Sequence, residues 1–208
     1  MQVATLIAGH FSENCYIVWD EAPGPAVVID PGGRPEQILE MLRQKELTLS
    51  LILITHAHFD HFLGAPALQR ATGAPVYVHR LDRDGIVAPG RHYGLPPSYR
   101  PPEDVRAVED GAQLTAGSMT FIYRHTPGHA RGACMIVCGD AIFSGDTLFA
   151  GDVGRVDLLG GDAEAMRQSL AQIASWPGDA TVYPGHEEAT TLAREKAENP
   201  YLQPPFRL

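Results

Sequence analysis

The residues best suited to chemistry are histidines and aspartates that fall in four short motifs. THAHFDH (55–61) follows directly after an apolar run, while HTPGH (125–129), SGDTLF (144–149) and YPGHE (183–187) each set a histidine or aspartate beside a glycine. The candidate side chains are His56, His58, Asp60, His61, His129, Asp146 and His186. Imidazole and carboxylate groups of this kind are common protein ligands of transition metals.

A bound metal is the simplest reason for these side chains to converge. Buried imidazoles and carboxylates without partners would be costly, whereas a cation satisfies them. Zinc suits these ligands, and so do iron and manganese, because no CxxC pair narrows the choice. Seven ligands exceed the needs of one tetrahedral ion and predict two divalent ions that share one carboxylate. The other histidines are assigned local structural roles: His10, His79, His92 and His125.

The charge of this predicted centre indicates what it would bind. Two divalent ions bring four positive charges, and two aspartates with a bridging hydroxide remove three, which leaves about one positive charge. A site of that charge favours an anionic substrate and stabilises an oxyanion.

Short strands must position the motifs, because each motif follows an apolar run. Strands are predicted at 3–8, 14–19, 25–30, 49–55, 75–79 and 181–184, with a hairpin-like series at 105–126 and two strands around a Gly-Asp turn at 134–146. Helices are predicted at 35–47, 63–72, 163–176 and 190–198. The proline-rich stretch 88–102 is predicted to be a loop that covers a site. This order predicts an α/β or α+β sandwich with helices outside the sheets, and 208 residues fit a single domain, 1–208.

Composition narrows the function classes further. A hydrophobic fraction of 44% with 20% charged residues is typical of a globular protein. The formal net charge of −9, without a Lys/Arg cluster, predicts no nucleic-acid partner. The N-terminus does not look like a signal peptide, and no apolar run approaches membrane-spanning length, so a cytoplasmic protein without a membrane partner is expected. Three scattered cysteines fit reduced thiols, and no oligomeric state is predicted.

The four motifs, in this order and at these spacings, together with VVIDPGG (27–33), resemble the metallo-β-lactamase superfamily over nearly the whole chain. The resemblance implies a four-layer αββα sandwich with a two-metal site at one edge. The implied ligands are, for the first ion, His56, His58 and His129, and, for the second, Asp60, His61 and His186. Asp146 would bridge both ions, and Asp30 would orient a ligand histidine. A plain turn-forming role for Asp30 stays open.

Within the superfamily, GDTLFAGDVGRVD (145–157) and PGHEEATTLAREKAENPYLQ (184–203) resemble the short bacterial glyoxalase II-like hydrolases. Full-length glyoxalase II carries a further helical C-terminal domain that grips glutathione, which this sequence is expected to lack. Asp157 and Glu188 stand where tyrosines typically contact glutathione, whereas Arg155 stands where a basic contact is expected. Arg155 could hold a substrate carboxylate through two parallel hydrogen bonds, or form an internal ion pair with a neighbour such as Asp152.

The resemblance implies a dinuclear metal-dependent thioester hydrolase. The implied substrate is S-D-lactoylglutathione, as in methylglyoxal detoxification, or a related small anionic acyl-thiol. Zinc is the first choice for both ions, with iron or manganese as alternatives. A metal-bridging hydroxide would attack the carbonyl, with Asp60 and Asp146 as the residues expected to take part in catalysis. The leaving thiol, with a pKa of about 8–9, would need no separate acid.

Other functions fit parts of the same framework. A mononuclear-iron persulfide dioxygenase would use two histidines and one carboxylate, and would leave Asp60, His61 and His186 without a metal. A lactonase-type hydrolase would use a similar metal site. A secreted β-lactamase is disfavoured by Asp146 and by the lack of a signal peptide. A binding or scaffold protein is disfavoured because every matched ligand position holds a competent residue, and a nuclease because the chain is acidic.

Overall fold

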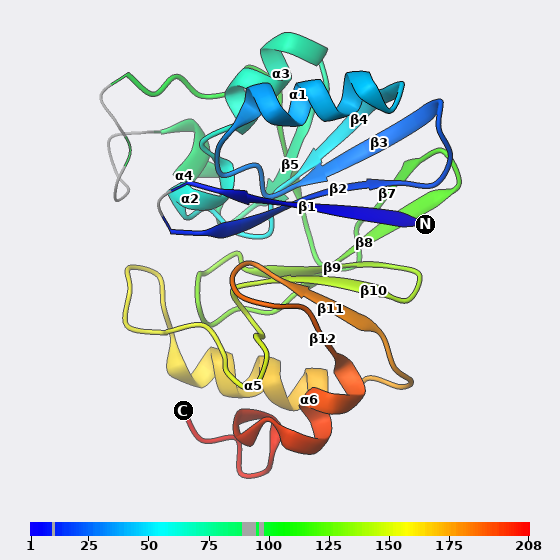
Figure 1. The fold of residues 1–208 in the computed structure, drawn as a ribbon. Coiled ribbons are helices and arrows are strands. Elements are labelled where there is room, and N and C mark those ends of the chain that lie inside the picture. The colour runs from blue at the N-terminus through cyan, green and yellow to red at the C-terminus, as the bar shows by residue number, and fades with distance from the viewer. Residues whose placement is uncertain (10, 89–94, 96–97) are drawn as a thin grey trace.

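A computed structural model describes residues 1–9, 11–88, 95 and 98–208, which form two six-stranded sheets facing each other (Figure 1). The first sheet contains, in spatial order, β1 (Gln2–Ala8), β2 (Glu13–Trp19), β3 (Gly24–Ile29), β4 (Leu47–Leu53), β5 (Val76–His79) and β6 (Val105–Val108). The second contains, in spatial order, β12 (Thr190–Thr191), β11 (Thr181–Pro184), β10 (Ala141–Gly145), β9 (Cys134–Cys138), β8 (Met119–His125) and β7 (Gln113–Ala116).

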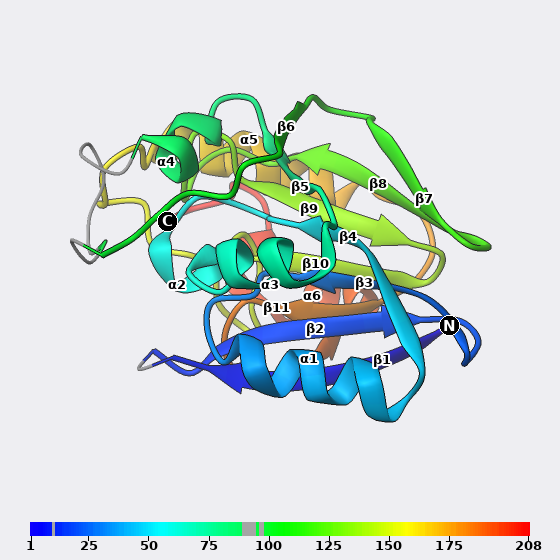
Figure 2. The same ribbon diagram turned by 90° about the horizontal axis from the view of Figure 1, so that it is seen from above.

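Helices cover the outer face of each sheet (Figure 1). The first sheet carries α1 (Pro35–Gln44) and α3 (Ala65–Thr72), which lie side by side over it when seen from above (Figure 2). The second sheet carries α5 (Ala163–Ala174) and α6 (Leu192–Glu198), followed by a 3-10 turn at Pro200–Leu202. Two short helices, α2 (Phe59–Phe62) and α4 (Arg83–Val87), follow β4 and β5. The four layers are the αββα sandwich that the resemblance implied.

Three apolar clusters hold these layers together. Ile38 and Leu42 of α1 pack with Ile52 in the outer cluster of the first sheet. Leu53 faces the other way and joins Phe121 and residues of both sheets in the central cluster. The outer cluster of the second sheet includes Met166, Leu170 and Ile173 of α5. Because the last three residues of β4 are buried on both faces of the sheet, the sequence there is a continuous apolar run rather than an alternating one.

Several predicted boundaries differ from the structure for identifiable reasons. The series predicted as hairpin-like at 105–126 divides between the sheets, because β6 pairs in parallel with β5 while β7 and β8 form a hairpin in the second sheet. The helix predicted at 35–47 ends at Gln44, because Leu47 already begins β4 beside Gly24 of β3. The loop predicted at 88–102 lies largely outside the described residues.

Within the described residues, none of the helices combines the length and apolar character needed to cross a bilayer.

Candidate metal centre

The predicted ligands come from both sheets and meet where strands end. On the side of the first sheet, Asp30 follows β3, His56 and His58 follow β4, and Asp60 and His61 lie in α2. On the side of the second sheet, His129 follows β8, Asp146 follows β10 and His186 follows β11. The strands thus fix the backbone a few residues before the ligands that follow them, which is how layered α/β proteins position their sites.

Three histidines form the first group of possible ligands. His58 Nδ1 lies 3.0 Å from His56 Nε2 and 2.8 Å from His129 Nε2. One nitrogen from each ring therefore points at the same small volume, and the three atoms lie within 4.8 Å of one another. His56 and His129 are buried, and His58 is partly so.

Asp60, His61 and His186 form the second group, again with one ligand atom each within 4.8 Å of the others. His186 Nε2 lies 3.5 Å from Asp60 Oδ2. Asp146 stands between the two groups, since its Oδ1 is 3.4 Å from His61 Nε2 and its Oδ2 is 3.4 Å from His129 Nε2. All seven candidates from the sequence are thus in one place.

Hydrogen bonds behind the rings orient four of the five histidines. His129 Nδ1 donates to the carbonyl of Arg155 at 2.8 Å, and His186 Nδ1 donates to the carbonyl of Phe11 at 3.1 Å. Since a carbonyl can only accept, each Nδ1 must carry the proton, and the inward Nε2 of each neutral ring carries a lone pair. Such partners on the outer nitrogen are typical of metal-bound histidine.

Asp30 and Thr55 orient the rings of the other two histidines, His61 and His56. Asp30 Oδ2 lies 3.0 Å from His61 Nδ1 and accepts a 2.6 Å hydrogen bond from the Thr55 hydroxyl. The hydroxyl oxygen is then free to accept from His56 Nδ1, 3.1 Å away. Asp30 itself adopts a left-handed backbone conformation, with φ of 49°, which aspartate tolerates better than most residues. It does so directly after β3, at the turn that the sequence marks.

The ring nitrogens that face one another in the first group have too few protons to form hydrogen bonds among themselves. His56 Nε2 and His129 Nε2 both present lone pairs to His58 Nδ1, which can donate at most one proton. In addition, His61 Nε2 and Asp146 Oδ1 are buried without a hydrogen-bond partner among the described residues. A buried set of unpaired lone pairs is expensive, whereas cations held between them satisfy every member. The donor set therefore fits divalent metal ions.

Electrostatics keep His56, His58 and Asp146 in their metal-binding forms. Burial lowers the pKa of His58 to about 4, with the nearby His129 and His61 adding to the effect, and burial also holds the pKa of His56 well below its usual range. Both rings are therefore neutral near pH 7. Burial raises the pKa of Asp146, but the adjoining imidazoles of His61 and His129 outweigh it and hold that pKa well below its ordinary value. Asp146 is therefore a carboxylate.

Glu13, which no sequence motif indicated, is completely buried at the start of β2. One oxygen of its carboxyl group lies within 4.8 Å of an Asp30 carboxylate oxygen and of a His61 ring nitrogen. Neither Glu13 carboxyl oxygen has a hydrogen-bond partner among the described residues. Burial raises its pKa well above the usual range. Nothing in the local sequence marks Glu13, because its neighbours come from other parts of the chain.

Two further sets of contacts that the sequence did not indicate hold the ligand loops. The Asn14 side chain donates to the carbonyls of Pro184 and Glu187, at 3.0 and 2.8 Å, and so fixes the loop that carries His186. Asp82 accepts hydrogen bonds from the backbone N–H groups of Ala57 and Gly132. It thereby ties the first histidine motif to the loop that carries His129.

The centre borders a cavity of about 790 Å³. His58, Asp60, His129, Asp146 and His186 contribute to its lining. Arg155 also lines the cavity, and its guanidinium forms two hydrogen bonds to Asp157, at 2.6 and 2.7 Å. An ion pair was one of the two roles considered for Arg155, although with Asp157 rather than Asp152. Its predicted contact with a substrate carboxylate stays a prediction.

Replacing Asp30 with asparagine is expected to weaken binding of the second metal ion by about 10–100-fold. If the asparagine amide faces His61 Nδ1, two donors meet and the imidazole must move its remaining proton to the inward Nε2. Metal titration followed by calorimetry measures the loss directly. Asp104→Asn is the matched control, because Asp104 forms an exposed ion pair with Arg106. Equal affinity in Asp30→Asn and the wild type would show that Asp30 does not orient the ligand.

The family model for the metallo-beta-lactamase superfamily matches residues 8–186. An uncharacterized protein of Mycobacterium leprae is 36% identical, over 98% of this chain and 99% of the relative. A hydroxyacylglutathione hydrolase of Haemophilus influenzae is 29% identical, over 97% of this chain and 98% of the relative.

Solved structures resemble this fold over nearly its whole length. TTHA1623 in a di-iron-bound form is 40% identical with a TM-score of 0.81, covering 96% of this chain and 100% of that one. The BLEG-1 B3 metallo-beta-lactamase has a TM-score of 0.85 at 33% identity, covering 97% and 99%. ETHE1 from Myxococcus xanthus has a TM-score of 0.77 at 30% identity, covering 97% and 84%.

Proposed function

The chain belongs to the metallo-beta-lactamase superfamily, and from that premise we propose that it hydrolyses thioesters with two divalent metal ions. The observation that carries the proposal is the convergence of two complete ligand groups on either side of Asp146. A single-iron dioxygenase would need only two histidines and one carboxylate as ligands. Asp60, His61 and His186 would then have no metal ion to bind.

The first ion would be held by His56, His58 and His129, and the second by Asp60, His61 and His186, with Asp146 shared. When bound, divalent ions supply Lewis acidity and lower the pKa of a coordinated water toward neutrality. Zinc is our first choice, and the di-iron form of TTHA1623 supports iron as the main alternative. Likeness to a hydroxyacylglutathione hydrolase supports the thioester class.

The protein's own residues prepare this site for an acyl transfer to water. Burial raises the pKa of Asp60, but the neighbouring His186 and His61 outweigh burial and hold that pKa below its ordinary value, so that Asp60 is a carboxylate facing the cavity. It can accept a hydrogen bond from a water there and orient it. The carbonyls behind His129 and His186 fix the tautomer of each neutral ring, with the proton on Nδ1 and the lone pair of Nε2 directed inward.

The lining of the cavity favours a thioester over an amide. Among the described residues that line it, there is no lysine or tyrosine to protonate a poor leaving group. A thiol has a pKa of about 8–9 and departs as the thiolate without such help. An amine leaving group would need a proton.

Release of free thiol from thioesters by the metal-loaded protein tests the proposal. S-D-lactoylglutathione and S-acetyl-N-acetylcysteamine are offered in parallel, and oxygen uptake with glutathione persulfide is followed in a separate cell. We expect thiol release from at least one thioester and no oxygen uptake. Oxygen consumption without thioester cleavage would replace this function with a dioxygenase.

A further inference from the structure

We propose that the cavity selects thioesters whose acyl chain is long and apolar over the short, polar lactoyl group. This inference rests on the proposed thioester hydrolysis and names the substrate class of that same site. It starts from the part of the cavity lining that binds no metal. Five large hydrocarbon side chains, here called the apolar wall, lie there: Phe11, Phe59, Phe149, Leu158 and Leu159.

The apolar wall begins directly at the metal centre. The backbone carbonyl of Phe11 accepts the hydrogen bond from His186 Nδ1, so that Phe11 is in direct contact with a candidate metal ligand. Phe11 packs edge-to-face on Phe59, with ring centroids 5.4 Å apart, and the Phe149 ring lies 6.3 Å from that of His186. A thioester carbonyl at the centre would therefore place its acyl chain against hydrocarbon.

Much of the wall is exposed to solvent. Phe11 is 60% exposed, Leu159 57% and Leu158 36%. These residues come from two loops at the same edge of the sandwich, one from each half: the loop between β1 and β2 and the loop between β10 and α5 (Figure 1). Large apolar side chains exposed around a concave site mark a place where an apolar ligand is buried. A chain lying between the two loops would cover both.

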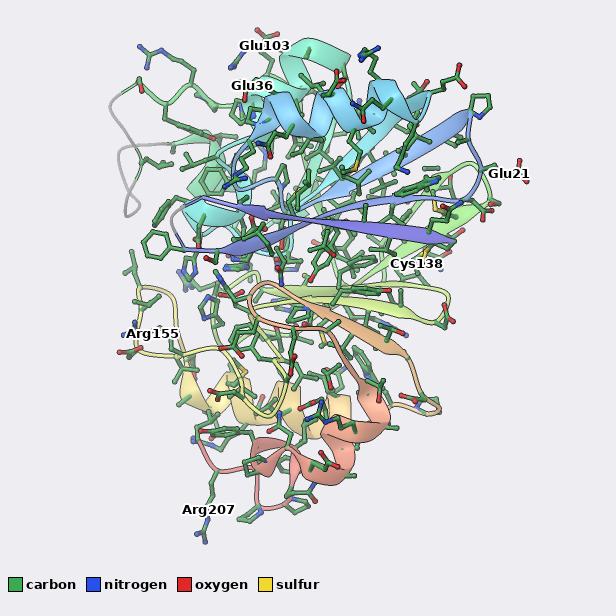
Figure 3. The ribbon with its side chains drawn as sticks, in the orientation of Figure 1. Glu21, Glu36, Glu103, Cys138, Arg155 and Arg207 are labelled. Atoms are coloured by element: carbon green, nitrogen blue, oxygen red, sulfur yellow. The ribbon has the colours of Figure 1, made fainter. Side chains whose placement is uncertain are left out.

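The cavity offers few partners for the two carboxylates of glutathione. Arg155 is the one lysine or arginine among the described lining residues, and its guanidinium is already engaged by Asp157. Figure 3 shows Arg155 on the loop between β10 and α5, at the outer edge of the molecule. Glu187 adds a further negative charge to the lining. The cavity therefore provides fewer favourable contacts for an anionic thiol than for a hydrocarbon chain.

A series of acyl-N-acetylcysteamine thioesters, from acetyl to octanoyl, tests this preference in the metal-loaded protein. Each methylene buried against the wall is expected to raise kcat/KM by about two- to fourfold, because the transfer of one methylene out of water changes the rate constant by up to that factor. Octanoyl-N-acetylcysteamine should also be cleaved faster than S-D-lactoylglutathione. Leu159→Ser should flatten the dependence on chain length.

Leu81→Ser is the matched control, because Leu81 is 44% exposed and lies outside this cavity. It should keep the chain-length dependence of the wild type. Calorimetric binding of S-octyl- and S-ethyl-N-acetylcysteamine, which cannot be hydrolysed, supplies a readout independent of turnover. The octyl compound should bind at least tenfold more tightly, and this difference should shrink in Leu159→Ser.

The outcomes separate this inference from the proposed function. Thioester cleavage with rates independent of chain length, or fastest with S-D-lactoylglutathione, would overturn the apolar preference and leave thioester hydrolysis standing. Tight binding of the octyl compound without cleavage of any thioester would overturn the hydrolysis and support the apolar site. Equal binding of both thioethers would overturn the inference.

Discussion

Replacing Asp146 with alanine is expected to lower thioester turnover by about a thousandfold, which corresponds to ~4 kcal/mol of transition-state stabilisation. Asp146 contacts both ligand groups, through His61 on one side and His129 on the other. Its removal therefore deprives both metal positions of an anionic ligand at once. Metal analysis after dialysis should find that the variant retains fewer ions per chain than the wild type.

Asp140→Ala is the control for this experiment, because Asp140 is an exposed aspartate in the turn that precedes β10. The two substitutions thus lie on either side of one strand and remove the same group. Asp140→Ala should keep the turnover and metal content of the wild type. Wild-type turnover in Asp146→Ala would show that the reaction does not use this centre.

Replacing Gly32 with alanine is expected to destabilise the protein by about 3 kcal/mol and to abolish metal binding at the second position. A Cβ atom at residue 32 would lie 1.4 Å from the backbone carbonyl oxygen of Asp60 and 2.6 Å from Glu13 Oε2. The start of α2, which carries Asp60 and His61, would have to move. For a chain of this length, the melting temperature should fall by roughly 6–12 °C.

Gly33→Ala is the neighbouring control. Its Cβ would meet nothing nearer than the backbone nitrogen of Gly9, at 3.3 Å, so that a small local shift accommodates it. Thermal unfolding and metal titration of the two variants side by side measure the difference. Equal stability of Gly32→Ala and Gly33→Ala would contradict the close packing of the turn against α2.

The sequence predicted the layers and the ligands because both depend on local signals. The run at 51–53 is apolar because β4 is covered on both sides there, and the residues that follow are polar because the strand ends there. The order of the motifs resembled one superfamily, and the match of its family model confirms that resemblance. Asp30 also stood out, as the last residue of an apolar run before Pro31.

The contacts that complete the site could not be predicted in the same way. Asn14 holds a loop that lies some 170 residues further along the chain, and Asp82 joins two loops that each belong to a different sheet. Glu13 begins a strand whose residues are all buried, so that its acidic side chain had no local pattern to set it apart. Such pairings depend on how the sheets are stacked, which no single motif specifies.

The most direct test of the account is the dependence of thioester turnover on metal content. Metal-free protein receives zinc or iron in known molar ratios, and thiol release from S-D-lactoylglutathione and from octanoyl-N-acetylcysteamine is measured at each ratio. We predict that turnover rises until two ions are bound per chain and then stays constant. Full turnover at one ion per chain, or no thiol release at any ratio, would contradict a two-metal thioester hydrolase.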